Sequence, residues 1–415
     1  MLTFDLHGII YRDLGKYPLC SQINKATCII LNMETATDRQ ERISWWRRDL
    51  IERARVAVIG AGALGNEVLK NLALLGIGRL HVFDFDIVEI SNLSRTVLFG
   101  PTSIGKSKAI LAAERTKELN VNSNAVVSGR HLDIVWELGA GYLRKMDVVL
   151  GCLDNLEARR SIGSKCYEFA IPYIDGGIRE LGGRIQLHKT GQGACMDCTI
   201  GEGERPALRN RYSCMSAMKS FQQQRVTPTV QVSSAFVGSI VSQEAVKLIQ
   251  GKPVSFGSVI SWFGETNDFD VLRLVRNPNC PTCSFPPTRP INELSISGES
   301  TAQDLFAHAG SEWSFILPSP FVRKFTCGLC SRSFETMKPS HHCKDTDFSC
   351  IHCNNAELID IDKIDTLTAK LEPEVLLLSL HNLGIPPFEV LRGTNDETTA
   401  LFELSADLNK FTELT

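Results

Sequence analysis

The sequence lacks an apolar run long enough to cross a membrane, and its first residues lack the pattern of a secretory signal peptide. It also lacks an excess of charge, because 44 Lys and Arg against 47 Asp and Glu give a formal net charge of −3. Nothing electrostatic therefore favours nucleic acid or a membrane surface as the main partner. We expect a cytoplasmic protein whose 415 residues form two or three domains.

Cysteine, by contrast, is abundant. Eight of the 14 cysteines form four C-x-x-C pairs: Cys195 with Cys198, Cys280 with Cys283, Cys327 with Cys330, and Cys350 with Cys353. In a reducing compartment such pairs indicate metal ligands rather than disulfides. Two pairs complete a tetrahedral Zn²⁺ site, so we predict one zinc site from the first two pairs and a second, of zinc-ribbon spacing, from the last two.

Alternatives remain open at both predicted zinc sites. The first two pairs could instead serve a redox function. At the second site one ligand could be replaced by a neighbouring residue: Cys343, His341, His342 or His352. We interpret Cys152, Cys166, Cys20 and Cys28 as ordinary core or near-core residues.

The stretch Arg55–Asp86 has the order strand, glycine turn, helix, strand and acidic residue. A short apolar run precedes Gly60, Gly62 and Gly65, which have G-x-G-x-x-G spacing, and a second apolar run ends at Asp84. Glycines let the backbone approach a phosphate chain, a helix N-terminus offers free N–H groups, and a carboxylate accepts ribose hydroxyls. This order predicts nucleotide binding by an α/β fold with a Rossmann-like, doubly wound, mostly parallel sheet.

Polar residues farther along the chain bear on the identity of the nucleotide. Asn92, Arg95 and Lys108 follow the acidic residue within a short span. Cations beside a triphosphate stabilise the charge that develops when a phosphate is attacked, whereas hydride transfer from NAD, the default ligand of this fold, needs no such cluster. Asp154 follows the predicted strand Asp147–Leu150 and could hold Mg²⁺; alternatively, it caps the predicted helix Leu156–Phe169.

The motifs GAGALG, DFD, SNLSRT, GKSK and GCLDN together resemble the adenylation domain of ubiquitin-activating enzymes. The same domain occurs in bacterial sulfur-carrier adenylyltransferases of the ThiF, MoeB and HesA type, and the resemblance covers about residues 38–284. It implies ATP as the nucleotide and a structural zinc at the first cysteine cluster. The implied nucleotide site consists of Gly60, Gly62 and Gly65 at the phosphates, Asp84 at the ribose, Asn92, Arg95 and Lys108 at the triphosphate, Asp154 at Mg²⁺, and Asp86 and Asn155 as further binding residues.

Two more residues match functional positions of this family. Arg39 matches an arginine that in homodimers reaches into the partner's active site, and Cys214 matches the cysteine that accepts the modifier as a thioester. Basic residues near Cys214 favour its thiolate, although a structural cysteine is the alternative. The resemblance thus implies catalytic roles for Arg39, Arg95, Lys108, Asp154 and Cys214.

The predicted function is that of a homodimeric activating enzyme for a ubiquitin-like protein. It would adenylate the C-terminus of the modifier, capture it on Cys214 and pass it to a conjugating enzyme. One alternative is a sulfur-carrier-protein adenylyltransferase in molybdopterin or thiamine biosynthesis, which shares the ATP site. Another is an NAD-dependent oxidoreductase or a non-catalytic zinc scaffold.

The predicted domains are an N-terminal arm (1–37), the adenylation domain (38–284), a proline-rich linker (285–300) and a small zinc-containing α+β module (301–415) for partner recruitment. Helical spacing is also present at Ile43–Ile51. In the last module the pattern predicts a helix at Val375–Leu383 and strands at Pro386–Arg392 and Leu401–Leu404.

Overall fold

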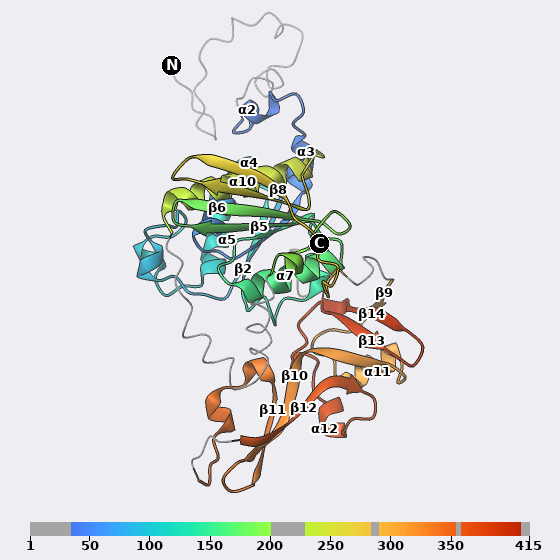
Figure 1. The fold of residues 1–415 in the computed structure, drawn as a ribbon. Helices are drawn as coiled ribbons and strands as arrows, with labels where there is room; N and C mark the ends of the chain where they lie inside the picture. Colours follow the sequence, from blue (N-terminus) through green and yellow to red (C-terminus); the bar gives the residue numbers. More distant parts are fainter. Residues whose placement is uncertain (1–34, 201–228, 284–289, 354–357, 408–415) are drawn as a thin grey trace, which may run out of the picture. The chain divides into compact units, whose positions relative to one another are not determined.

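A computed structural model describes residues 35–200, 229–283, 290–353 and 358–407 (Figure 1). The chain divides into two units, residues 1–46 and 47–415. In the first unit, the described residues contain the short helix α2 (Asp38–Glu41). No helix among the described residues has both the length and the apolar character that a membrane span requires.

The second unit begins with an eight-stranded sheet in the order β3-β2-β1-β4-β5-β6-β7-β8. Its strands are β1 (Arg55–Ile59), β2 (Arg79–Asp84), β3 (Val126–His131), β4 (Val148–Gly151), β5 (Tyr173–Arg179), β6 (Gly182–His188), β7 (Ser258–Phe263) and β8 (Asp268–Arg273). Neighbours from β3 to β5 are parallel, and those from β5 to β8 are antiparallel.

The prediction of an α/β fold is confirmed, and the sheet is mixed, with four parallel and three antiparallel pairs of neighbouring strands. Two residues join β5 to β6, and the first of them, Glu180, has a positive φ of 50°. So short a connection permits only an antiparallel return, whereas parallel strands need a long crossover. The result is a hairpin of β5 and β6 in which Asp175 is paired with Gln186.

Helices cover both faces of this sheet (Figure 1). They are α3 (Arg48–Arg53), α4 (Ala63–Leu75), α5 (Lys108–Leu119), α6 (Ala140–Leu143), α7 (Leu156–Glu168) and α10 (Gln231–Ile249), with 3-10 turns at Ile90–Asn92, Pro101–Ser103 and Met196–Thr199. Helix α4 contacts α5 and α10, whereas α6 contacts α7. Successive residues of a strand point to opposite faces, so Ala57 and Ile59 pack with Ala158 and Ile162 of α7 in one apolar cluster.

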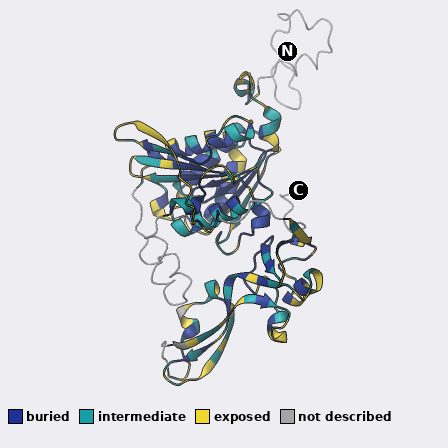
Figure 2. Cartoon of the chain, turned by 45° about the vertical axis from the view of Figure 1, so that its right-hand side comes forward, coloured by how far each residue is buried: buried dark blue, intermediate teal, exposed yellow. Residues whose placement is uncertain are grey.

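The sequence predicted helix α7 within one residue of its observed bounds. Helix α10 comes close to α4 because Gly238 faces Glu67, where an added Cβ would lie 2.8 Å from that of Glu67. The helix predicted at Ile43–Ile51 is shorter, since α3 begins only at Arg48. Figure 2 shows the central strands of the sheet largely buried.

The C-terminal module is built on a six-stranded sheet with the order β11-β10-β13-β14-β9, and β12 pairs with β10. Its elements are β9 (Ile291–Leu294), α11 (Ala302–Ala309), β10 (Ser314–Cys327), β11 (Ser333–Pro339), β12 (Leu358–Thr368), α12 (Pro373–Leu376), β13 (Val390–Thr394) and β14 (Thr399–Leu404), with 3-10 turns at Ser340–His342 and Asp345–Phe348. The prediction of an α+β module is confirmed.

Three details of this module differ from the sequence-based prediction. The stretch predicted as a linker contains β9 and the buried Ile296, so these residues belong to the module's sheet and core. The predicted helix Val375–Leu383 reduces to α12, and β13 starts at Val390 rather than Pro386. Strand β13 starts later than predicted because Phe388, directly after two prolines, has a positive φ of 57°, which is outside the strand region.

Contacts also join the module to the first sheet's domain. The Gly141 N–H donates to the Phe388 carbonyl at 2.8 Å, and the Phe388 ring meets Tyr142 edge-on at 6.0 Å. Glu168 of α7 pairs with Arg392 at 2.5 Å. The module therefore packs against α6 and α7 through both apolar and charged contacts.

Candidate nucleotide site and metal centres

The three glycines after β1 differ in the space that a side chain would have at each position. Gly60 has a φ of 96°, and an added Cβ would lie 2.5 Å from the Cys152 carbonyl oxygen. A Cβ on Gly65 would lie 1.9 Å from the Gly60 carbonyl oxygen, whereas one on Gly62 would meet nothing within 4 Å. Gly60 and Gly65 therefore allow the turn to close against the β4 loop, and Gly62 leaves open space at the N-terminus of α4.

The N-terminus of α4 suits an anion. Gly62 occupies the N-cap position, and no side chain of the described residues caps this end of the helix. Its first N–H groups are thus available, and the helix dipole adds partial positive charge at the same place. Strands β1 and β4 are neighbours at which the strand order reverses, and ligands of open α/β sheets bind at such a switch point.

Asp84 ends β2 beside the glycine turn. One carboxylate oxygen accepts the Ala61 N–H and the other accepts the Asp86 N–H, both at 2.7 Å. Burial raises the pKa of Asp84, and these hydrogen bonds together with nearby Lys108 oppose the rise. The bonds hold the carboxylate at the end of the strand, where the sequence places a ribose-binding acid.

The predicted triphosphate residues lie after Asp84 and are partly engaged with protein groups. The Lys108 Nζ is largely buried and pairs with Asp86 at 2.8 Å. Asn92 is buried and accepts the Glu89 N–H at 2.9 Å, while Arg95 donates to the Ser91 carbonyl at 2.9 Å. The structure thus makes Asp86 the partner of Lys108, and a bound phosphate would compete with Asp86 for that cation.

Asn66 is a residue that sequence reasoning missed. It is fully buried, and its amide nitrogen donates to the carbonyls of Ala61 and Gly62 at 2.7 and 3.0 Å. Its Oδ1 accepts the Leu98 N–H at 2.9 Å. Asn66 therefore ties the glycine turn to the segment after Arg95. The helix also carries the polar residues Glu67, Lys70 and Asn71, so no local pattern singled out Asn66.

The loop after β4 carries Asp154 and Asn155, and the structure separates their roles. Asn155 caps α7, because its Oδ1 accepts the Ala158 N–H at 2.8 Å. The alternative interpretation of Asp154 as this cap is therefore wrong. Within the described part of the chain, the exposed Asp154 carboxylate forms no hydrogen bond or ion pair, which fits a group that can ligate Mg²⁺.

A buried polar network next to this loop was also missed. Arg159 forms an ion pair with Asp175 of β5 and donates a second hydrogen bond to the Leu153 carbonyl. The Tyr173 hydroxyl donates to Asp175 at 2.8 Å, and burial raises the pKa of that hydroxyl well above its usual value. The partners lie on three different elements, the loop after β4, helix α7 and strand β5, so no local pattern indicates the network.

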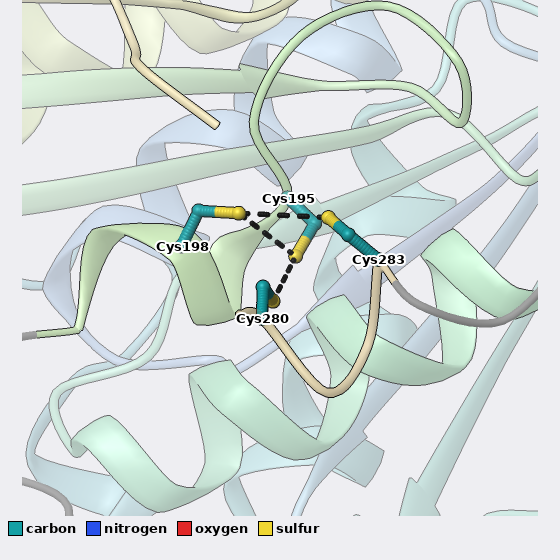
Figure 3. A group of neighbouring side chains, drawn as sticks. All are labelled: Cys195, Cys198, Cys280 and Cys283. Carbon is teal, nitrogen blue, oxygen red and sulfur yellow. Dashed lines mark hydrogen bonds between the residues drawn. The ribbon is translucent and has the colours of Figure 1, made fainter. Parts of the chain in front are cut away.

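The first cysteine cluster has the geometry of a tetrahedral metal site (Figure 3). All four Sγ atoms of Cys195, Cys198, Cys280 and Cys283 lie within 4.8 Å of one another. The sulfur atoms of Cys195 and Cys280 and those of Cys198 and Cys283 are 3.5 Å apart. Zn–S bonds of about 2.3 Å place sulfur atoms about 3.8 Å apart in a tetrahedron, so the residues fit Zn²⁺.

The second cluster has the same ligand chemistry. The Sγ atoms of Cys327, Cys330, Cys350 and Cys353 also lie within 4.8 Å of one another. The structure thus groups the same eight cysteines into two clusters as the sequence predicted. Cys152 and Cys166 are buried, and burial raises the pKa of both thiols, in keeping with core residues.

The structure does not place two of the predicted catalytic residues relative to this site. Arg39 is exposed on α2 in the first unit. Cys214 lies outside the described residues, as do Cys20 and Cys28. Their proposed roles remain predictions.

Comparison with known proteins identifies the family. The model of the ThiF family matches residues 38–282. The chain belongs to the ThiF family. It is 30% identical over 249 residues to the sulfur carrier protein adenylyltransferase of Thermus thermophilus, covering 58% of this chain and 86% of the relative. It is 28% identical over 242 residues to the molybdopterin-synthase adenylyltransferase of Escherichia coli, covering 57% and 89%.

Activating enzymes of modifiers also match this ThiF chain. The SUMO-activating enzyme subunit 2 of Dictyostelium discoideum is 34% identical over 151 residues, but these span only 36% of this chain and 22% of that protein. The crystal structure of E. coli MccB with ATP shares the fold, with a TM-score of 0.50, 22% identity, and coverage of 61% of this chain and 74% of that one. The ThiF match and the relatives named adenylyltransferases show that the chain is an enzyme of this type.

Proposed function

We propose that the enzyme uses ATP to adenylate the C-terminal carboxylate of a ubiquitin-like or sulfur-carrier protein. The observation that carries this proposal is the meeting of three strand ends of a ThiF domain at one switch point. Asp84 at the end of β2 accepts the Ala61 N–H of the glycine turn after β1. Gly60 of the same turn lies against the Cys152 carbonyl, in the loop after β4 that carries Asp154. Relatives that match most of this domain are named adenylyltransferases.

The residues present suit this chemistry. An ionised carboxylate needs no general base, so catalysis requires orientation of the tail and neutralisation of charge on the phosphates. The backbone at Gly62 and the α4 N-terminus would bind the phosphates, and Lys108 and Arg95 would offset their charge. Asp154 would hold Mg²⁺, which when bound neutralises phosphate charge. The carboxylate oxygen bonds to the α-phosphorus and pyrophosphate leaves.

After adenylation, we propose that the modifier is captured on Cys214 as a thioester and then passed to a conjugating enzyme. In that step the thiolate attacks the acyl carbon and AMP leaves. The sequence around Cys214 supports this proposal, because it combines an unpaired cysteine with basic neighbours. The C-terminal module would recruit the conjugating enzyme or the modifier. A homodimer would bring Arg39 of one subunit to the active site of another, and we place the enzyme in the cytoplasm.

The second candidate function is a sulfur-carrier adenylyltransferase that produces only the acyl adenylate for sulfur transfer. It is favoured by the match across 86% of the Thermus thermophilus sulfur carrier protein adenylyltransferase. We propose that both cysteine clusters bind structural Zn²⁺ in either case, because each offers four thiols at tetrahedral spacing.

ATP–pyrophosphate exchange tests the proposed function. Exchange should require Mg²⁺ and a small carrier protein with a free C-terminal glycine, and Asp154→Ala should abolish most of it. Mass spectrometry of the products then separates the candidates: a reductant-sensitive adduct that disappears in Cys214→Ala supports the thioester, and a thiocarboxylate on the carrier supports sulfur transfer. An adduct that persists in Cys214→Ala would refute the role of this cysteine.

A further inference from the structure

We propose that Arg159 is a positioning residue that, with Asp175 and Tyr173, forms a buried clamp holding the Asp154 loop in the place where it binds the metal–nucleotide complex. The inference rests on the proposed function, since Asp154 is the proposed Mg²⁺ ligand. It adds residues that have no part in the chemistry described above.

The clamp joins strand β5, helix α7 and the loop between β4 and α7. Arg159 lies on the first turn of α7, and its two terminal nitrogens reach different partners: one pairs with Asp175 and the other donates to the Leu153 carbonyl. Leu153 immediately precedes Asp154 in the chain. The guanidinium therefore fixes the peptide next to the proposed metal ligand without occupying that ligand's carboxylate.

The remaining side of the clamp is rigid. Tyr173 donates to the Oδ1 of Asp175 while Arg159 engages the Oδ2, so both carboxylate oxygens have partners. Tyr173 and Asp175 are fully buried, and Arg159 is only 8% exposed. Groups this enclosed have few alternative positions, so the Arg159 guanidinium that donates to the Leu153 carbonyl is held in place.

Two glycines, Gly151 and Gly177, leave room for the side chains of the clamp. A Cβ on Gly151 would lie 2.3 Å from the Tyr173 hydroxyl oxygen and 2.8 Å from the Asp175 Oδ1. Gly151 is the last residue of β4, so glycine there lets the strand end against the network. A Cβ on Gly177 would come within 3.4 Å of the Arg159 guanidinium.

A role in fold stability alone accounts poorly for this arrangement. Removing a buried ion pair from water is costly, and apolar residues of similar volume commonly replace such pairs without loss of stability. What an apolar pair could not supply is a charged donor aimed at the Leu153 carbonyl. Hydrogen bonds to the groups that surround a metal ligand orient that ligand and influence metal affinity.

Arg159→Lys is the sharpest variant, because lysine keeps the charge beside Asp175 but has a single ammonium group that does not reproduce the planar fork. Arg160→Lys is the matched control. Arg160 is the next residue of the same helix and pairs with Asp197 at 2.9 Å, away from Leu153. Tyr173→Phe is a milder second variant that removes one hydrogen bond from Asp175.

The experiment is calorimetric titration of each full-length variant with a non-hydrolysable ATP analogue, with Mg²⁺ and with EDTA, together with hydrogen exchange of a peptide spanning residues 152–155. In Arg159→Lys we expect unchanged affinity in EDTA, but a Mg²⁺ concentration for half-maximal tightening that rises about tenfold. Exchange of the peptide should also accelerate in the nucleotide-free protein. Tyr173→Phe should shift in the same direction by less, and Arg160→Lys should match the wild type.

The outcomes distinguish failure of the clamp from failure of the proposed function. If the wild-type protein binds no analogue, or binds it without any effect of Mg²⁺, the proposed function fails. If the wild type shows the Mg²⁺ effect and Arg159→Lys shows the same Mg²⁺ dependence, the clamp is overturned while the function stands. Equal weakening of binding with and without Mg²⁺ in Arg159→Lys would also overturn it, because that result indicates general damage to the site.

Discussion

Replacing Asn66 by alanine would cut the connection between the glycine turn and the segment that carries Arg95. Asn66 is fully buried on α4 and makes three side-chain hydrogen bonds, to Ala61, Gly62 and Leu98. The Gly62 carbonyl keeps a partner in the variant, because it also accepts the backbone N–H of residue 66 at 2.9 Å. The Leu98 N–H and the Ala61 carbonyl lose the hydrogen bonds that Asn66 makes to them.

The expected cost follows from those two groups. A buried polar group that loses its partner costs about 1–3 kcal/mol, so the two groups together should lower the free energy of unfolding of Asn66→Ala by roughly 2–6 kcal/mol. For a domain of this size each kcal/mol shifts the melting temperature by about 2–4 °C. The adenylation-domain transition should therefore fall by roughly 4–24 °C in differential scanning calorimetry.

A local readout and a matched control complete the test. The Leu98 amide should lose its protection in hydrogen exchange, because its acceptor is gone. Asn71→Ala is the control: Asn71 lies on the same helix but makes one long bond, 3.4 Å to Ser242, and should cost less than about 1 kcal/mol. An Asn66→Ala protein with wild-type melting and a protected Leu98 amide would show that Asn66 does not support the turn.

Three further predictions concern the glycines, the acid and the cysteines. Gly65→Ala should prevent correct folding, because its Cβ would lie 1.9 Å from a carbonyl oxygen, whereas Gly62→Ala should fold and bind ATP more weakly, as circular dichroism and ATP titration would show. Since burial raises the pKa of Asp84, protonation on acidification should weaken ATP binding at a higher pH than for an ordinary carboxyl, and Asp84→Asn should remove that pH dependence in the same titration. Atomic absorption should find two zinc ions per chain; Cys198→Ser and Cys330→Ser should each lose one, and a protein isolated without zinc at either cluster would contradict the assignment.

The sign of the Asp84 effect differs between binding and stability. A folded-state pKa above the unfolded value means that the folded protein binds the proton more tightly. The contribution of Asp84 to stability is therefore largest at low pH and is lost as the pH rises through its folded-state pKa. ATP binding has the opposite dependence, since the ionised carboxylate accepts the ribose hydroxyls.

Local patterns in the sequence determined the nucleotide-binding unit and the cysteine clusters. The glycine spacing after β1, the acid after β2 and the C-x-x-C pairs each depend on residues a few positions apart, and short-range backbone and ligand geometry fixes what such spacings can form. The order of these motifs along the chain also sufficed to indicate the family.

Tertiary structure alone decided which distant residues meet. Arg159 finds Asp175, and Asn66 finds Leu98, only because strand order and helix packing bring separate segments together. The same holds for the antiparallel half of the sheet and for Asn155 rather than Asp154 as the helix cap. Hydrogen bonds depend on tenths of an ångström and on orientation, which strand register and side-chain packing set and a linear pattern does not record.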